Sequence, residues 1–219
     1  MGGVGNGELE SARVTRLLRD DITLGRRLPG ARLVERDIAA ELNVSRLPER
    51  EVIRALVSEG IVVARPRSWA KVREFTTRDI QDFAEVREAI ETLIFTFAAE
   101  RHDASGLERL LRVVDREEEA AAAGDADAAR TAAAEFHEIV GQLASNDMLN
   151  ELIGVFVTRL RWLFGQHDDL IGMAQEHRVL YATIAARDVT TLRTMVPHHL
   201  SKGRMAAEKR LIQYGTFTI

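Results

Sequence analysis

Apolar residues in the first third of the chain follow three stretches of helical spacing and then two short extended stretches. The spacing predicts helices over about 8–23, 34–42 and 45–60, and short strands over 61–63 and 70–72. Ser45 is an N-cap candidate, and Pro48 fits the first turn of the third helix. Three helices followed by a small hairpin describe a winged helix-turn-helix, which we expect over residues 8–74.

From about residue 79 onward, the apolar positions follow helical periodicity alone. This pattern predicts helices over roughly 79–102, 105–123, 126–144, 147–164, 168–186 and 188–213. The expected product is an antiparallel α-helical bundle over residues 79–213, a fold whose core commonly holds ligand or metal sites. The protein is therefore predicted to be mainly α.

Composition narrows the class of protein. The 219 residues are 46% apolar and 29% charged, which predicts packed domains rather than a disordered chain. The absence of cysteine excludes disulfide scaffolds, thiolate zinc sites and cysteine nucleophiles. No apolar run approaches the ~20 residues that a transmembrane helix needs, and the N-terminus lacks the features of a signal peptide. We therefore expect a cytoplasmic protein without a membrane partner.

The net charge of −4 is unevenly distributed. Residues 1–74 carry 14 Lys and Arg against 11 Asp and Glu, whereas residues 75–219 carry 16 against 23. A basic first part joined to an acidic second part fits a DNA-binding module fused to a partner domain. The basic excess is small, so charge alone leaves chance as an equal explanation.

Three arginines define one face of the third predicted helix. Arg46, Arg50 and Arg54 recur every four residues and so form one ridge. Arginine side chains bind guanine O6 and N7 in the major groove or neutralise phosphates. On an isolated helix, pairing of this ridge with Glu49 and Glu51 in solvent would be the simpler interpretation. Within a winged helix-turn-helix, the ridge favours binding to double-stranded DNA.

The same region resembles the GntR family of bacterial transcription regulators. The matching motifs are Pro29-Gly30-Ala31-Arg32-Leu33, Glu35-Arg36-Asp37-Ile38-Ala39, Ser45-Arg46-Leu47-Pro48-Glu49-Arg50-Glu51 and Glu59-Gly60-Ile61-Val62. They cover nearly all of residues 9–73 with the family's spacing preserved. The resemblance implies that Arg36, Ser45, Arg46 and Arg50 contact the operator DNA, with Arg67 on the wing.

Polar side chains lie on apolar helix faces in the predicted bundle, where burial requires a partner. Arg87 occupies such a position and needs an anion, either an internal carboxylate or a bound acid. His177 and His199 occupy two more, and His137 flanks the apolar stripe of its helix. Three neutral imidazoles from three helices suit a divalent metal, whereas a hydrogen bond in the core explains each one alone. The residues by themselves leave both interpretations open.

Residues 79–210 resemble the FCD ligand-binding domain of the FadR branch, or subfamily, of GntR regulators. The matching stretches are Val86-Arg87-Glu88-Ala89-Ile90-Glu91, Glu135-Phe136-His137, Glu176-His177-Arg178-Val179-Leu180, Ala186-Arg187-Asp188 and His199-Leu200. The resemblance implies a metal bound by an Asp and three histidines, and a nearby arginine that holds a carboxylate effector. His137, His177 and His199 occupy the histidine places, and Arg87 is the candidate for effector binding.

The Asp place falls at Ala133, which cannot ligate a metal. Glu135, two residues before His137, is expected to point to another face. We therefore expect a three-histidine site for zinc or nickel, completed by water or by the effector itself. The acidic run that begins at Glu117 is interpreted as a solvated helix end.

Three functions are compatible with these features. The first is a homodimeric regulator whose affinity for operator DNA changes when a small carboxylate binds. The second is a metal-dependent, hydrolase-like enzyme that uses the three histidines. Against the enzyme, Glu135 and Glu176 are expected to face away from the histidines, which leaves no clear general base. The third is a helical interaction domain whose histidines only pack. We expect the regulator and no enzyme.

Overall fold

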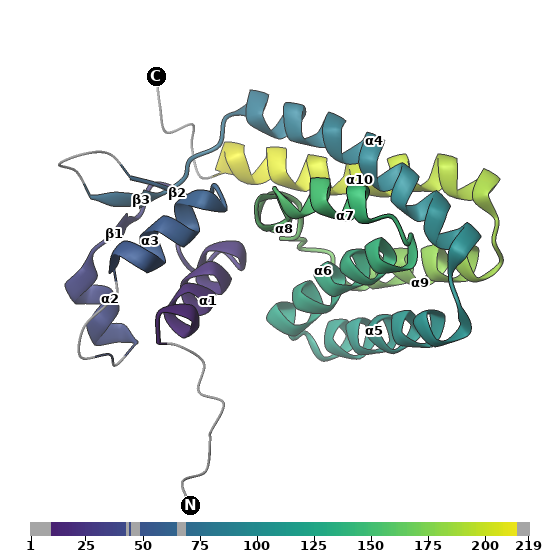
Figure 1. Cartoon of the computed structure of the whole chain (residues 1–219), viewed down its shortest axis with the longest axis horizontal. Helices are drawn as coiled ribbons and strands as arrows, with labels where there is room; N and C mark the ends of the chain where they lie inside the picture. The colour runs from purple at the N-terminus through teal and green to yellow at the C-terminus, as the bar shows by residue number, and fades with distance from the viewer. Residues whose placement is uncertain (1–9, 43, 45–48, 65–68, 214–219) are drawn as a thin grey trace, which may run out of the picture. The chain divides into compact units, whose positions relative to one another are not determined.

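The computed structural model describes residues 10–42, 44, 49–64 and 69–213, drawn as coloured ribbon in Figure 1. The chain divides into two compact units after Glu74, and each unit buries its own set of apolar side chains. None of the described helices combines the length and the apolar character that a membrane span requires.

The N-terminal unit contains the helices α1 (Glu10–Thr23), α2 (Glu35–Glu41) and α3 (Glu49–Ser58). Val14, Leu18 and Ile22 recur every four residues along α1 and are fully buried. This spacing places them on one face, and α1 packs against α3, whose Val52 and Leu56 are buried as well. The predicted helical N-terminal module is confirmed.

A small antiparallel sheet completes this unit. It consists of β1 (Arg32–Leu33), β2 (Val62–Val63) and β3 (Ala70–Val72) in the order β1-β3-β2. Gly30 has φ +79°, and its N–H donates to the carbonyl of Val72 at 3.0 Å, so this turn brings β1 alongside β3. Pattern analysis predicted only the hairpin and missed β1, because two residues are too few to show an alternation.

The C-terminal unit is a bundle of helices (Figure 1). Their bounds are α4 (Thr77–Arg101), α5 (Ala104–Ala123), α6 (Ala126–Leu143), α7 (Asp147–Gly154), α8 (Val157–Phe164), α9 (Leu170–Ala185) and α10 (Val189–Gln213). Phe95 of α4 and Phe136 of α6 are fully buried in the main core, to which α5, α9 and α10 also contribute apolar side chains. This core fixes the three helices that carry the candidate histidines.

The prediction of one continuous helix over 147–164 is wrong. The segment forms α7 and α8, and Phe156 between them has φ −132° and ψ 8°, outside the helical region. Gly154 ends α7, which is consistent with the low helix propensity of glycine. The break matters for function because both short helices line the cavity described below.

Several helix ends are fixed by side chains that the sequence supplies locally. Thr76 and Asp79 form a capping box at the start of α4. The side chains that accept a backbone N–H at the starts of α5, α6, α7 and α9 are Asp103, Asp125, Asn146 and Asp169. Such caps satisfy N–H groups that have no partner within the helix.

Candidate metal centre and effector cavity

Three histidines from three helices meet inside the C-terminal unit. His137 lies on α6, His177 on α9 and His199 on α10, and one ligand atom of each lies within 4.8 Å of the others. The Nε2 atoms of His137 and His199 are 3.5 Å apart. His177 is 1% exposed and His199 6%, so the bundle shields both rings from solvent. The neighbouring His198 is exposed and does not belong to this cluster.

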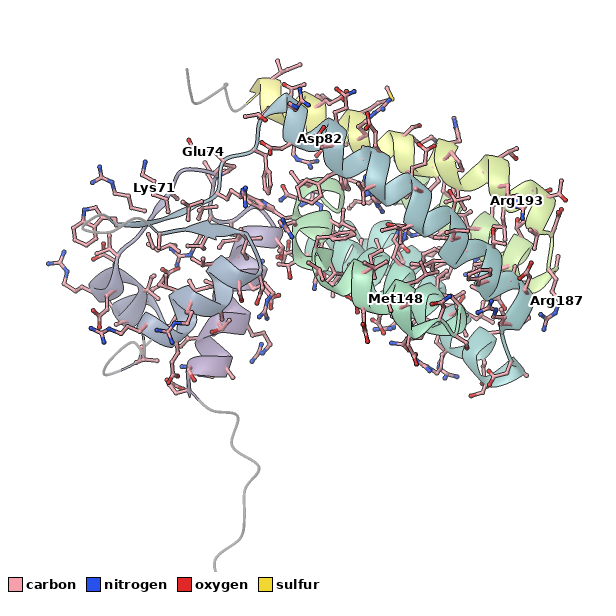
Figure 2. The ribbon with its side chains drawn as sticks, turned by 45° about the horizontal axis from the view of Figure 1, so that its top comes forward. Lys71, Glu74, Asp82, Met148, Arg187 and Arg193 are labelled. Atoms are coloured by element: carbon pink, nitrogen blue, oxygen red, sulfur yellow. The ribbon has the colours of Figure 1, made fainter. Side chains whose placement is uncertain are left out.

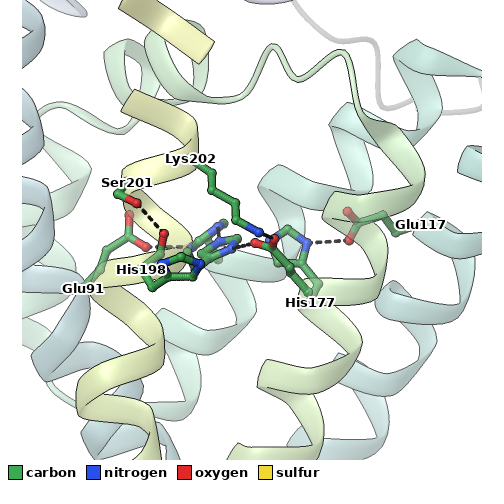
Figure 3. Close-up of polar contacts among 9 residues, drawn as sticks. Glu91, Glu117, His177, His198, Ser201 and Lys202 are labelled. Carbon is green, nitrogen blue, oxygen red and sulfur yellow. Dashed lines mark hydrogen bonds and ion pairs between the residues drawn. The ribbon is translucent and has the colours of Figure 1, made fainter. Parts of the chain in front are cut away.

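Each of the three rings turns its Nδ1 toward a glutamate. The Nδ1–Oε2 distances are 2.7 Å for His137 and Glu91, 2.7 Å for His177 and Glu117, and 3.0 Å for His199 and Glu176. Figure 3 shows Glu117 reaching His177 from a neighbouring helix, with Glu91 on the opposite side of the cluster. A carboxylate in this position orients the ring of a metal-binding histidine and raises its basicity. Nε2 is thereby left as the ligand atom on all three rings.

Burial keeps two of the imidazoles in the neutral form that binds metals. It lowers the pKa of His199 to about 3, although the hydrogen bond to Glu176 acts in the opposite direction. Burial also lowers the pKa of His177 well below its ordinary value. For Glu176, burial opposes ionisation, but hydrogen bonds from His199 and Lys202 outweigh it and lower its pKa to about 2.

The other two carboxylates differ in their charge partners. Burial opposes the ionisation of Glu91, but Arg87 and His137 outweigh it and hold its pKa well below the usual range. Glu117 is 1% exposed, and burial raises its pKa to about 8 because the attraction of His137 is too weak to compensate. Glu91 is therefore an anion at neutral pH, whereas Glu117 holds a proton more tightly.

The histidine cluster fits a divalent transition metal. The Nε2 of His177 is buried and has no hydrogen-bond partner among the described residues, which is costly in a core unless a ligand takes its lone pair. Zn–N bonds of about 2.0–2.1 Å at tetrahedral angles separate ligand nitrogens by about 3.4 Å. The Nε2 atoms of His137 and His199 are 3.5 Å apart, which matches this spacing. The three histidines would hold the ion, which would supply a Lewis-acidic position for an anion.

Nothing at position 133 contributes a carboxylate to this cluster. Ala133 is 6% exposed and lies on the wall of the adjacent cavity. Glu135 points elsewhere, and its carboxylate accepts a hydrogen bond from Arg116 at 2.9 Å. The described residues would therefore offer a metal three nitrogen ligands, and water or an added anion would take the remaining coordination positions.

The chain matches two family models. The model described as bacterial regulatory proteins, gntR family, matches residues 10–72, and the FCD domain model matches residues 82–202. The FCD match alone spans more than half of the chain. This chain belongs to the GntR family of transcriptional regulators. Its second unit contains an FCD domain.

Similar proteins agree with this assignment. The probable D-xylose utilization operon transcriptional repressor of Paenarthrobacter nicotinovorans is 26% identical over 184 residues, which are 83% of this chain and 81% of that protein. A putative transcriptional regulator GntR from Rhodococcus sp. RHA1, known from its crystal structure, has a TM-score of 0.76 at 26% identity, with 92% of this chain and 99% of that chain covered. E. coli McbR/YncC shares the fold, with a TM-score of 0.78 at 21% identity and coverage of 94% and 98%.

A cavity of about 390 Å³ lies beside the histidines of this regulator. Arg87, His137 and His177 are among its lining residues. Of the two anions that the sequence analysis left open for Arg87, the structure shows the internal one, because its Nε donates to Oε1 of Glu91 at 2.5 Å. The guanidinium also lies 5.1 Å from the ring centroid of Phe164. The arginine is thus held at the cavity wall by a carboxylate and an aromatic ring.

Sequence reasoning missed His167, which lines the same cavity. It lies between α8 and α9, where no helical periodicity marks a buried side. Arg130 donates to its carbonyl from Nη2 at 2.8 Å and from Nε at 3.1 Å, which ties this segment to α6. Burial, together with the charges of His177, His199 and Arg87, lowers the pKa of His167 to about 3. Its ring is therefore a neutral hydrogen-bonding group beside the histidine cluster.

Two interpretations of acidic residues are wrong. Glu117 does not belong to a solvated helix end, because its side chain is buried against His177. Glu176 does not face away from the histidines, because it contacts His199 and also pairs with Lys202. Glu117 could have been found from its position, since it follows Leu110, Val113 and Val114 on the buried stripe of α5.

The described part of the DNA-binding unit leaves the predicted arginines free of the core. Arg36 exposes 91% of its side chain, and Arg50 and Arg54 are exposed on α3. Ser45, Arg46 and Arg67 lie outside the described residues. The apolar Val57 of α3 is also 39% exposed.

Proposed function

We propose that this regulator binds a palindromic operator as a homodimer and that a small carboxylate modulates its operator affinity. The carboxylate binds beside a divalent metal, zinc or nickel, held by His137, His177 and His199. The observation that carries the proposal is the close approach of the three histidines, each with one ligand atom within 4.8 Å of the others, while a glutamate faces the Nδ1 of each ring. We also propose that the protein belongs to the FadR branch, because it combines a GntR-type unit with an FCD domain, and that it acts in the cytoplasm.

The metal and Arg87 together favour an anionic effector. Three protein ligands leave open positions on an ion that prefers four or more, and a carboxylate oxygen is a suitable ligand for zinc and nickel. Arg87 lines the cavity beside two of the histidines and attracts the same group. Ala133 supplies no negative charge to offset that of the metal. The bound anion therefore contributes more to metal affinity here than it would in a site with an aspartate at position 133.

Operator binding would use arginines of the first unit. Arg36, Arg46 and Arg50 read base edges or bind phosphates, with Ser45 and Arg67 as further contacts. Two copies are required because the half-sites of a palindrome mirror the two-fold symmetry of a dimer. Light scattering is expected to give twice the 24.5 kDa of one chain.

Effector binding changes operator affinity only if the effector favours one arrangement of the dimer over another. The coupling is reciprocal, so operator DNA must change the affinity for the carboxylate by the same factor. An effector that binds all arrangements equally would leave DNA binding unchanged, however tightly it bound.

The hydrolase alternative has no support from the similar proteins, whose names describe transcriptional regulators. The acidic groups nearest the histidines are each engaged with an Nδ1 atom. None of these groups is left to serve as a general base, so we propose no enzymatic activity.

Metal analysis of the purified full-length protein tests the proposal. After reconstitution with zinc at neutral pH, the wild type is expected to retain one metal per chain, His177→Ala to lose it, and Ala133→Asp to bind it more tightly. His198→Ala is the matched control, because this neighbouring histidine is exposed and outside the cluster. Absence of stoichiometric metal from both the wild type and Ala133→Asp would contradict the proposal.

A further inference from the structure

The cavity beside the histidines has a strongly apolar wall. The residues that form it are Ile94, Phe95, Ile153, Val157, Leu160 and Phe164. They come from α4, α7 and α8, so the break between the two short helices helps to shape this wall. Such a wall favours a ligand whose body is hydrocarbon, because burial of apolar surface is favourable and needs no directed partner.

The polar lining residues are unevenly placed. Glu138 and Gln142 are exposed and therefore belong to the opening of the cavity, and Gln142 accepts a hydrogen bond from Arg109. The buried polar residues Arg87 and His177 lie at the histidine end, where His167 is also found. The half-buried Asn150 and Arg161 also line the cavity, on α7 and α8. A hydroxyl group placed against Val157, Leu160 or Phe164 would lose its water without gaining a partner from these side chains, which weakens binding by roughly tenfold for each group.

We infer that the effector is an amphiphilic monocarboxylate. Its acid group binds at the end formed by the metal, Arg87 and His167, and its carbon chain or ring, free of hydroxyl groups, lies along the wall formed by Val157, Leu160 and Phe164. This inference rests on the proposed function and specifies its ligand. The inference excludes sugar acids as effectors, because they carry the same acid group on a hydroxylated carbon chain.

The size of the cavity limits the length of the acid. A volume of about 390 Å³ lies near the lower end of the range for small-molecule sites, which is about 300–1,000 Å³. A cavity of this size suits a small acid rather than a long lipid chain. Arg161, half-buried on the same wall, is the lining cation that a second acid group would reach, so a dicarboxylate is the competing ligand class.

Calorimetric titration of the zinc-loaded full-length protein with three six-carbon acids tests the inference. Hexanoate carries an apolar body, gluconate a hydroxylated one and adipate a second acid group. We expect hexanoate to bind at least tenfold more tightly than gluconate and more tightly than adipate. Shortening hexanoate to butanoate is expected to weaken binding about fourfold for each methylene removed.

A nearly isosteric variant tests the wall itself. Val157→Thr places a hydroxyl in the apolar wall without changing its shape, and we expect it to weaken hexanoate binding severalfold without weakening gluconate binding. Val179→Thr is the matched control, because Val179 is 51% exposed on α9 and does not line the cavity. Its hexanoate affinity should equal that of the wild type.

Equal or tighter binding of gluconate or adipate would overturn this inference while leaving a carboxylate effector in place. Unchanged hexanoate affinity in Val157→Thr would overturn it as well. Failure of all three acids to bind the zinc-loaded protein would overturn the inference together with the carboxylate part of the proposed function.

Discussion

At the residue scale, buried glutamates determine what the three histidines can do. The apolar faces of the sequence identified His177 and His199, since both lie among residues spaced three and four apart. Their acidic partners are harder to recognise in the sequence, because an acidic residue within a charged run is usually solvated. The partner of His177, Glu117, is followed directly by Glu118 and Glu119, and this run conceals its place on the buried stripe of α5.

A substitution at Glu117 tests whether these partners serve a metal. Glu117→Gln keeps the size of the side chain but removes the carboxyl group whose Oε2 lies 2.7 Å from Nδ1 of His177. Loss of such a partner typically weakens metal affinity 10- to 100-fold, and we expect a weakening in this range. Competition with a chromophoric zinc chelator measures the dissociation constant.

Glu118→Gln is the matched control for this measurement. Glu118 is the next residue along α5, and its carboxylate binds Arg178 rather than a histidine. Its zinc affinity should match that of the wild type. Equal zinc affinities for the two variants would mean that Glu117 only fills space in the core.

At the element scale, arginines recur at the carboxyl ends of neighbouring helices. Arg187 donates to the carbonyls of Ala99, Glu100 and His102 at the end of α4. Arg101 does the same for Ala144 and Ser145 at the end of α6. A cation at this end satisfies carbonyls that have no partner within the helix and interacts favourably with the helix dipole. Periodicity predicted most helices of the bundle but not these contacts, which join residues more than 40 positions apart.

Arg187 gives the clearest test of this arrangement. Arg187→Ala removes three charge-assisted hydrogen bonds, and we expect the free energy of unfolding to fall by about 1–2 kcal/mol. Arg193→Ala is the control, because Arg193 is exposed on α10 (Figure 2), and its loss should change stability by less than about 0.5 kcal/mol. Urea denaturation followed by circular dichroism measures both values. Equal stability of the two variants would show that the helix-end contacts of Arg187 contribute nothing.

Helix α3, which we propose as the recognition helix, carries the prediction for DNA binding. Arg50 is exposed on this helix, so Arg50→Ala should leave the fold intact and weaken operator binding by about 1–3 kcal/mol if the side chain reads a base. If it binds a phosphate instead, the main effect is a smaller dependence of affinity on salt. Fluorescence anisotropy at several salt concentrations distinguishes the two roles.

Arg112→Ala is the control for this experiment. Arg112 is an exposed arginine of α5, in the other unit, and pairs with Glu108. Its removal changes the net charge by the same amount and should leave operator binding near the wild-type value. If Arg50→Ala bound the operator with the affinity and the salt dependence of the wild type, a contact between Arg50 of α3 and the operator would be excluded.

At the scale of the whole molecule, a basic DNA-binding unit and an acidic helical unit divide the tasks of the regulator. Both fold classes could be predicted from the sequence, because short helices, turn glycines and long apolar stripes leave clear local patterns. The cavity could not, because its wall combines side chains of α4, α6, α7 and α8 that only the packed bundle brings together. The candidate histidines could be identified from local spacing in the sequence, but only the packing of the bundle brings each of them to its glutamate partner.

The most direct test of the account is the operator affinity of the zinc-loaded protein with and without carboxylate. An operator selected from genomic fragments would be titrated with wild type and with His177→Ala, each alone and with hexanoate, gluconate or adipate. We expect at least one acid to change the wild-type dissociation constant by about fivefold or more, within the usual range of allosteric coupling, and we expect no such change in His177→Ala. Identical dissociation constants under all these conditions would contradict it.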